Sequence, residues 1–499
     1  MSESHEQRFE LWRQRAGLVL FVPAFALIWL LPLDLPPAAH RLAAILASVV
    51  VLWISEAIPM AMTAFLGVAV AAMLQVAPPA EAFAPFADPL IFLFIGTFML
   101  AQAIFVHGLD RRFALAILSL PGVGRSPGRV LAAFAGATCL ISMWISNTAT
   151  TAMMYPIALS LLRFLEPRGN DQRVSQFGAV LLLSAAFASS IGGLATPVGT
   201  PPNLIGIGFI RRELGVGFPF FSWMAVGLPV SLTLFAWLAF DFTRTTRDGS
   251  ASAQALAAMF RDGGITTVIA AERRKLGPWT RGQINTVIAF GATVALWVLP
   301  GLVALMLGQE HWLYQKLTAV LPESVVALLG ATALFLLPID TRRNEFTLSW
   351  QQAVKIDWWI VFLYGGGIAL GTLAFKTGLA EALGQALTSW LGIRSGFALL
   401  LMSTIVATVL SETTSNTAAA NMVVPVVIAF ARSSGLDPLV PALGATMGAS
   451  LGFILPVSTP TNAIVYGSGH IPLPVMMRHG VLLDVIGISV IVAGLTLLH

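Results

Sequence analysis

The sequence predicts an all-α polytopic membrane protein with about 11 transmembrane helices, two re-entrant helical hairpins and an inverted internal repeat. Three observations lead to this prediction. Apolar residues make up 57% of the 499 residues and charged residues only 10%, a surplus that a water-facing globule cannot bury. The apolar residues gather in long runs, as spanning helices require. Several short motifs also occur twice, in the same order, in the two halves of the chain.

A spanning helix needs about 20 apolar residues, and runs of this kind recur along the whole chain. The first run follows three arginines but has no small-residue cleavage site after it, so we expect a retained helix and not a signal peptide. The predicted spans are 17–33, 41–58, 61–77, 89–107, 174–210, 222–242, 282–300, 323–339, 358–376, 439–470 and 480–498.

Lys and Arg decide the orientation of these spans. With the N-terminus in the cytoplasm, 21 of the 28 Lys and Arg residues fall in cytoplasmic segments, which is the bias expected of a multi-pass protein. We therefore expect a protein of the plasma (inner) membrane with its N-terminus cytoplasmic and its C-terminus outside. The longest polar stretch, 243–281, is then a cytoplasmic linker between the two halves.

The two halves share three blocks. Phe92-Leu93-Phe94-Ile95-Gly96 matches Phe362-Leu363-Tyr364-Gly365-Gly366, the Ser-Asn-Thr-Ala run at 146–149 matches 415–418, and 197–203 matches 456–462. Under the predicted orientation the first copy starts outside and the second starts inside. The copies are therefore inverted, as in many secondary transporters.

Two further apolar stretches, 130–162 and 396–431, are interrupted near their middles by polar residues. Each half is about 15 residues, or about 22 Å as a helix, which is shorter than a bilayer core. We interpret each stretch as a re-entrant hairpin with a polar tip, because polar backbone at membrane depth has to be buried or line a cavity. The alternative is two ordinary helices joined by a polar turn.

The spans 174–210 and 439–470 are also interrupted, by Gly-Thr-Pro-Pro-Asn and by Ser-Thr-Pro-Thr-Asn. Proline breaks the helix and frees carbonyl groups, and glycine allows close approach of a ligand. Carbonyl, hydroxyl and amide oxygens suit a small hard cation such as Na⁺, whereas the free N–H groups and hydroxyls suit an anion.

The sequence offers no support for several function classes. No nucleophile–base pair or metal-ligand cluster supports an enzyme, no Gly-rich phosphate loop supports ATP-driven transport, and the scattered basic residues do not indicate nucleic-acid binding. No Lys or Arg lies in either hairpin tip or broken loop. An anion held there needs dipoles, hydroxyls and co-bound cations. A channel, a membrane receptor and a membrane-embedded enzyme are the alternatives from other classes.

At these residues the chain resembles the divalent anion:sodium symporter family of di- and tricarboxylate transporters. The resemblance is carried by Trp53-Ile54-Ser55-Glu56-Ala57-Ile58-Pro59, by both Ser-Asn-Thr tips, by the Gly-Gly-Gly at 365–367 and by 455–463. These motifs cover residues 53 to about 469. The resemblance implies a homodimer in which a transport domain moves against a scaffold domain as an elevator, with Na⁺ as the co-transported ion and no organic cofactor.

The resemblance also implies the site residues. The substrate-binding positions would be Asn147, Thr148, Thr200, Asn416, Thr417, Thr459 and Pro460. The first Na⁺ site would use Ser142, Ser146, Asn147 and Gly199, and the second would use Ser411, Ser415, Asn416 and Ser458. Ser411, Ser458 and Thr461 depart from the residues that are frequent in the family, and all three fall at the second site.

The predicted domains follow from this assignment. They are scaffold helices with an interfacial arm in 1–129, the first hairpin and broken helix in 130–242, the linker 243–281, a second scaffold part with an arm in 282–394, and the second hairpin, broken helix and last span in 395–499. The arms are the amphipathic stretches that start at Leu109 and Leu379.

The predicted function is import of C4-dicarboxylates such as succinate, malate and fumarate by Na⁺ symport. A sodium-independent dicarboxylate exchanger and a transporter of citrate or sulfate are the alternatives within the class. Two carboxylates, Glu56 and Glu412, fall inside apolar runs. Each either couples ions or accepts hydrogen bonds from nearby backbone, and we favour the structural role for both.

Overall fold

The computed structural model describes residues 5–165, 172–245 and 251–497, and almost all of its regular structure is helical. The first half of the chain contains α1 (His5–Leu30), α2 (Pro37–Ser55), α3 (Met60–Met73), α4 (Pro79–Phe83), α5 (Pro89–Val106), α6 (Leu109–Leu118), α7 (Pro127–Ser142), α8 (Asn147–Leu165), α9 (Gln172–Gly193), α10 (Pro201–Phe209), α11 (Phe220–Arg244), α12 (Ala251–Arg261) and α13 (Gly264–Lys275). Short 3₁₀ and π turns lie at 84–87, 123–125 and 210–214.

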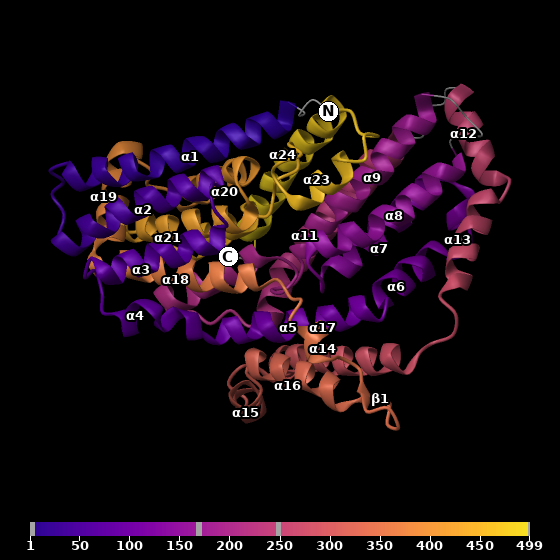
Figure 1. Cartoon of the computed structure of the whole chain (residues 1–499), viewed down its shortest axis with the longest axis horizontal. Coiled ribbons are helices and arrows are strands. Elements are labelled where there is room, and N and C mark those ends of the chain that lie inside the picture. The colour runs from indigo at the N-terminus through magenta and orange to yellow at the C-terminus, as the bar shows by residue number, and fades with distance from the viewer. Residues whose placement is uncertain (1–4, 166–171, 246–250, 498–499) are drawn as a thin grey trace.

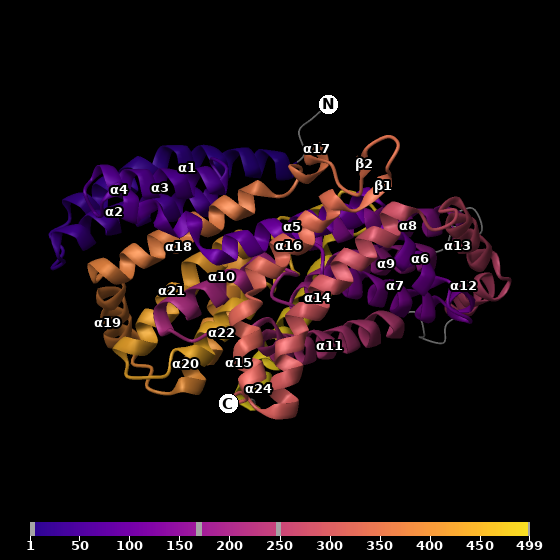
Figure 2. The ribbon, with the colours of Figure 1, turned by 90° about the horizontal axis from the view of Figure 1, so that it is seen from below.

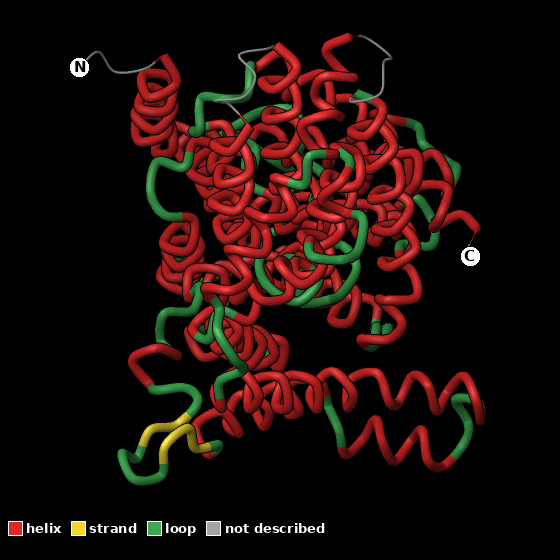
Figure 3. Tube along the Cα trace, turned by 90° about the vertical axis from the view of Figure 1, so that its right-hand side faces the viewer, coloured by secondary structure: helices red, strands yellow, loops and turns green. Residues whose placement is uncertain are grey.

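The second half begins with a peripheral group of helices that carries the two short strands of the described chain. It contains α14 (Arg281–Leu307), α15 (Trp312–Val320), α16 (Glu323–Leu336), β1 (Pro338–Asp340), β2 (Glu345–Phe346), α17 (Trp350–Ala353), α18 (Trp358–Thr377), α19 (Leu379–Leu391), α20 (Gly396–Thr413), α21 (Asn416–Ser433), α22 (Leu439–Gly448), α23 (Pro460–Tyr466) and α24 (Leu473–Leu497). Figure 3 shows the antiparallel β1–β2 hairpin outside the main helical body.

Two groups of helices flank the centre of the molecule. In Figure 1 α7, α8 and α9 run side by side, with α12 and α13 along their outer edge. Figure 2 shows α1 to α4 gathered on the opposite flank next to α18. The N-termini of several helices are fixed by local sequence: Asp88 caps α5 through the Leu90 N–H at 2.8 Å, and Thr280 and Gln283 form a capping box at α14.

The polar interruptions fall where the sequence predicts them. One hairpin breaks between α7 and α8, the other between α20 and α21, and the broken loops separate α9 from α10 and α22 from α23. The legs of the hairpins have 16 to 19 residues, so the expectation of about 15 residues is too short. The polar residues at each tip take part in the second leg, because Asn147 and Asn416 begin α8 and α21.

Nine helices in the described ranges are long and apolar enough to span a membrane, or ten if the bent pair α15–α16 counts as one span. The count differs from the predicted 11 because α3, α16 and both halves of the second broken run, α22 and α23, are too short by themselves, whereas α9 of the first broken run and the hairpin leg α20 pass the test. Length and composition alone therefore do not separate a hairpin leg from a crossing helix.

The two arms start at the predicted positions. Gly108 and Gly378 precede α6 and α19 with φ of 62° and 82°, in the left-handed region that glycine enters without steric cost. This conformation turns the chain sharply between a span and an arm. The same device therefore appears in both halves, 270 residues apart in the sequence.

The predicted linker 243–281 contains two helices that pack against the first arm and the first hairpin. Arg111 of α6 forms an ion pair with Glu272 of α13 at 2.5 Å, and Lys275 pairs with the same carboxylate at 2.5 Å. The hydrogen bond from Lys275 and the charge of Arg111 hold the pKa of Glu272 below its usual value. The segment is therefore part of the folded body. Residues 246–250 lie outside the described residues.

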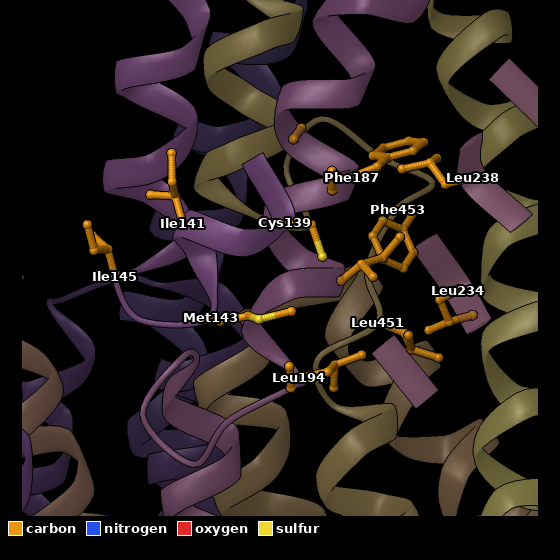
Figure 4. Packing of buried hydrophobic residues seen from close by; sticks show 14 of the residues in the cluster. Cys139, Ile141, Met143, Ile145, Phe187, Leu194, Leu234, Leu238, Leu451 and Phe453 are labelled. Atoms are coloured by element: carbon orange, nitrogen blue, oxygen red, sulfur yellow. The ribbon is translucent and has the colours of Figure 1, made fainter. Parts of the chain in front are cut away.

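A continuous core joins the first hairpin to the second broken loop. Figure 4 shows Cys139 of the first hairpin close to Phe187 of α9 and Phe453 of the second loop. The Phe187 and Phe453 rings meet edge to face with their centroids 5.1 Å apart, a favoured aromatic geometry. Cys139 is buried in this apolar cluster and has no disulfide. Elements from both halves of the chain thus share one core.

Candidate functional site

The first hairpin tip has a compact hydrogen-bonded structure. The Ser142 hydroxyl donates to Asn147 Oδ1 at 2.8 Å, and the Ala149 N–H donates to Ser146 Oγ at 3.4 Å. Ser146 therefore caps the start of α8, as a helix that begins with free N–H groups requires. The Asn147 side chain is oriented by a residue five positions earlier, on the other leg.

The second tip repeats these contacts. The Ser411 hydroxyl donates to Asn416 Oδ1 at 2.7 Å, and the Ala418 N–H donates to Ser415 Oγ at 3.2 Å. Ser411 also donates to the Ala449 carbonyl at 2.8 Å, which ties the tip to the neighbouring broken loop. The duplicated Ser-Asn-Thr sequence therefore encodes the same local geometry twice.

Each broken loop is closed by one asparagine. The Asn203 amide donates to the carbonyls of Gly193 and Thr196 at 2.9 and 2.8 Å. The Asn462 amide donates to the carbonyls of Gly452 and Leu455 at 3.0 Å each. Both asparagines are fully buried. In each loop the asparagine satisfies one carbonyl, of Gly193 or Gly452, that the helix break would otherwise leave unpaired in the interior.

Glycine lets the first tip and the first loop approach each other. A Cβ on Gly193 would lie 2.4 Å from Asn147 Oδ1, and a Cβ on Gly199 would lie 2.6 Å from the Gly193 carbonyl oxygen. In the second half the spacing is looser, because a Cβ on Gly452 would lie 3.4 Å from Asn416 Oδ1. The first tip thus presents closely packed oxygen atoms around Asn147.

The broken-helix regions also contain buried oxygen atoms of the kind that can hold a Na⁺ ion. Asn203 Oδ1, Asn462 Oδ1 and Ser450 Oγ are buried and have no hydrogen-bond partner within the part of the chain that the structure describes. Carbonyl, amide and hydroxyl oxygens are the donors that hard cations prefer. The structure brings Ser142 to Asn147 and Ser411 to Asn416 as the sequence predicts, and it places Gly199 beside Gly193 at the first tip.

A cavity of about 640 Å³ lies where the two tips meet the two loops. Its lining includes all of the predicted substrate-binding residues, which are Asn147, Thr148, Thr200, Asn416, Thr417, Thr459 and Pro460. Ser146, Ser415 and Ser458 line it as well, whereas Ser142, Ser411 and Gly199 are outside the lining. The cavity therefore unites predicted site residues that are as far apart in the sequence as Asn147 and Pro460.

Several residues that line this cavity are not among the predicted site residues. Ser190 and Thr461 come from the elements next to the loops, and Thr461 Oγ1 lies 2.7 Å from Thr459 Oγ1. Arg13 of α1 and Asp357, just before α18, come from the opposite flank. Burial raises the pKa of the Asp357 carboxyl. Thr461 could have been found from the repeated Thr-Pro motif, but no local pattern marks Arg13.

Glu412 has the structural role that we favoured. Its carboxylate accepts the N–H groups of Ile454 and Leu455 at 2.9 and 3.2 Å and the Ser458 hydroxyl at 2.5 Å. Glu412 thereby joins the second hairpin to the second loop. The buried Asp484 of α24 lies beside it. The Ser458 hydroxyl therefore donates its proton to the Glu412 carboxylate.

Glu56 forms an ion pair instead of a backbone hydrogen bond. Its carboxylate lies 3.2 Å from the Arg13 guanidinium, and the residue ends α2 with a left-handed φ of 48°. Gly365, Gly366 and Gly367 of α18 are packing positions, because a Cβ on each would lie within 2.5 Å of a neighbouring atom. These glycines permit close helix packing.

Comparisons with known proteins identify the family of this chain. Residues 12–497 match the family described as the sodium:sulfate symporter transmembrane region. The chain is 32% identical over 488 residues, 96% of its length and 90% of the relative, to the sodium-dependent dicarboxylate transporter SdcS of Staphylococcus saprophyticus. SdcS of Staphylococcus aureus strain USA300 is 31% identical over the same coverage.

The fold also resembles a solved transporter structure. The chain superposes on MtrF of Neisseria gonorrhoeae, from a class of antimetabolite efflux pumps, with a TM-score of 0.52 and 10% identity, covering 94% of this chain and 96% of that one. At this identity the likeness concerns the fold alone. The match to the family spans nearly the whole chain, including both tips and both loops. The chain therefore belongs to the divalent anion:sodium symporter family and is an all-α polytopic membrane transporter, not an enzyme.

Proposed function

We propose that the protein imports C4-dicarboxylates together with Na⁺ across the plasma (inner) membrane. The observation that supports this most directly is the cavity lined by both Ser-Asn-Thr tips and both Thr-Pro loops. Two opposed sets of hydroxyl, amide and helix N-terminal N–H groups suit an anion with a carboxylate at each end. Succinate, malate and fumarate have this shape.

The charge of the site supports coupling to sodium. Neither tip and neither loop contains a Lys or Arg, so a dianion bound there needs another source of positive charge. Co-bound Na⁺ ions supply it, and the oxygen-rich loops can hold them. The names of the SdcS relatives, sodium-dependent dicarboxylate transporters, point to the same ion and substrate class.

Each residue then has a role. Ser142, Ser146, Asn147 and Gly199 form the first Na⁺ site, and Ser411, Ser415, Asn416 and Ser458 form the second. Substrate carboxylates contact Asn147, Thr148 and Thr200 on one side and Asn416, Thr417, Thr459 and Pro460 on the other. Each asparagine thus contributes to an ion and to the substrate, which links their binding.

Transport proceeds by an elevator motion within a homodimer, with the N-terminus in the cytoplasm and the C-terminus outside. The hairpins and broken helices at 130–162, 174–210, 396–431 and 439–470 move as one body, and 41–107 and 282–376 remain with the dimer. The shared core that joins the first hairpin to the second broken loop supports motion as a unit. Helices α6 and α19 are the arms between the two bodies.

Cysteine pairs across the boundary between these bodies test the motion. In the Cys139→Ser background, a pair that crosslinks only in the inward-facing state is expected, with several ångströms of displacement between states. Cross-boundary distances that stay the same in both states would favour a fixed site with gating at the hairpin tips.

Uptake of labelled succinate into proteoliposomes tests the function. Uptake that requires an inward Na⁺ gradient is the expected result. Uptake that requires only internal dicarboxylate would identify a sodium-independent exchanger. Competition by malate and fumarate should be strong and by acetate weak, and stronger competition by sulfate or citrate would overturn the substrate assignment.

A further inference from the structure

The N-terminal helix α1 reaches the proposed substrate cavity. Glu10 and Arg13 of α1 line the cavity together with both hairpin tips. The register of α1 on α2 is fixed at Gly17, where a Cβ would lie 1.9 Å from Ser55 Oγ. One helical turn before this close contact, Arg13 is therefore held at a defined place beside the end of α2.

The ion pair with Glu56 does not use all of the hydrogen-bond donors of the Arg13 guanidinium. The guanidinium lies 3.2 Å from Glu56, its side chain is 17% exposed, and its Nε has no hydrogen-bond partner among the described residues. The segment that carries Glu56 also contacts the second tip. Met60, four residues after Glu56, accepts a hydrogen bond from the Ser415 hydroxyl through its sulfur at 3.2 Å. Arg13 thus faces the same cavity as Ser415.

Arg13 is the one basic side chain among the described residues that line the cavity, and Glu10, Glu56 and Asp357 are its acidic ones. These carboxylates repel a dianion, whereas a guanidinium presents a planar set of donors that matches a carboxylate. Glu56 keeps Arg13 neutralised while the cavity is empty, since an unpaired, largely buried cation is costly.

We propose that Arg13 is a specificity-determining residue that binds one carboxylate of the substrate while the cavity faces α1. The incoming carboxylate takes the place of Glu56 on the guanidinium. A dianion can hold Arg13 with one end and a hairpin tip with the other, which a monocarboxylate cannot do. This inference rests on the proposed transport of dicarboxylates, and it places a cation from α1 in a site whose tips and loops have none.

Four single variants in proteoliposomes test the proposal, with the KM for succinate and the thermal unfolding temperature measured for each. Arg13→Gln should raise the KM for succinate by about tenfold or more, because charge-assisted hydrogen bonds are lost. The KM of Arg13→Lys for succinate should lie between those of the wild type and Arg13→Gln. Glu56→Gln should lower the KM, because Arg13 no longer has to leave a carboxylate. Arg15 lies on the exposed face of α1. Arg15→Gln is therefore the matched control, and it should leave the KM for succinate and the unfolding temperature unchanged.

A purely structural ion pair predicts a different pattern. It would make Arg13→Gln and Glu56→Gln change KM and unfolding temperature in the same direction, and that result would overturn the proposal. An unchanged KM in Arg13→Gln would do so as well. If Arg13→Gln does not fold, Glu56→Gln decides, since an unchanged or higher KM excludes the exchange of partners. Absence of succinate uptake in the wild type would instead contradict the proposed function.

Discussion

Asn203 and Asn462 close the two broken loops, so replacing them tests whether those loops form the ion sites. Each amide donates two hydrogen bonds to loop carbonyls at 2.8 to 3.0 Å, and each side chain is fully buried. Alanine removes both donors at once. The Gly193 and Gly452 carbonyls then have no hydrogen-bond partner among the described residues. The Thr196 and Leu455 carbonyls keep a backbone N–H donor, from Gly199 at 3.4 Å and from Ser458 at 3.3 Å.

The size of the effect follows from the number of bonds lost. A buried carbonyl left unpaired costs about 1–3 kcal/mol, and loss of the second hydrogen bond costs about 0.5–1.5 kcal/mol, so each substitution costs about 1.5–4.5 kcal/mol if the loop does not move. A loop that relaxes to recover part of this energy no longer holds its oxygens around the ion. Since about 1.4 kcal/mol is tenfold in affinity, we expect the KM for Na⁺ to rise by about tenfold or more in Asn203→Ala and Asn462→Ala.

The assay is succinate uptake at varied Na⁺ concentration, with thermal unfolding of the same purified protein. Asn285→Ala is the matched control. The Asn285 amide also donates two hydrogen bonds, to the Pro338 carbonyl at 3.1 Å and to Thr347 Oγ1 at 2.9 Å, but it lies outside the cavity lining. This variant should lose stability and keep the wild-type KM for Na⁺.

One result would refute the role of the two asparagines in forming the ion sites. If Asn203→Ala and Asn462→Ala lower the unfolding temperature as Asn285→Ala does and leave the Na⁺ dependence of uptake unchanged, the loops have only a structural role. The assignment of the Na⁺ sites to the tip–loop contacts would then be wrong.

Three further predictions follow from the site and its surroundings. Asn147→Ala and Asn416→Ala should each abolish uptake while the protein still folds, as checked by proteoliposome uptake and size-exclusion chromatography; near wild-type uptake in either would contradict the paired-site arrangement. Asp484→Asn should keep transport and stability, because an amide can donate a hydrogen bond to the neighbouring Glu412 carboxylate. Glu412→Ala should lower the unfolding temperature, because it removes the acceptor of three hydrogen bonds. Equal unfolding temperatures of the two variants would contradict this prediction. Because the folded-state pKa of Glu272 is lowered, its stabilising ion pairs are fully present above its usual value of 4.5 and are lost as pH falls through the folded value; Glu272→Gln should remove this acid-side loss from the pH dependence of thermal unfolding.

The helix breaks and the polar tips could be predicted from the sequence because they are local properties. Proline at 201 and 460 and the Ser-Asn pairs at 146–147 and 415–416 interrupt or cap a helix wherever it lies. Their repetition in the same order predicted that the two tips would be equivalent. The structure agrees at the level of single bonds, with 2.8 Å from Ser142 to Asn147 and 2.7 Å from Ser411 to Asn416.

The lengths of the helices and the contact partners of individual residues depended on the tertiary structure. The hairpin legs extend beyond the predicted 15 residues because neighbouring helices bury them, and the segment 251–275 folds against α6 because Glu272 meets Arg111 there. Apolar periodicity says that a segment is buried, but it does not say against what. For the same reason the partner of Glu412 could not be read from its neighbours in the sequence.

Composition, helix breaks and repeated motifs are properties of the chain alone, so they were enough to predict a membrane transporter with two equivalent polar tips. Which distant residues complete the cavity depends on how the helices pack in three dimensions. Arg13 lies beside Glu56 and the second tip because the Gly17–Ser55 contact sets the register of α1 on α2. Such a contact depends on the packing of whole helices, which one helix's own sequence does not specify.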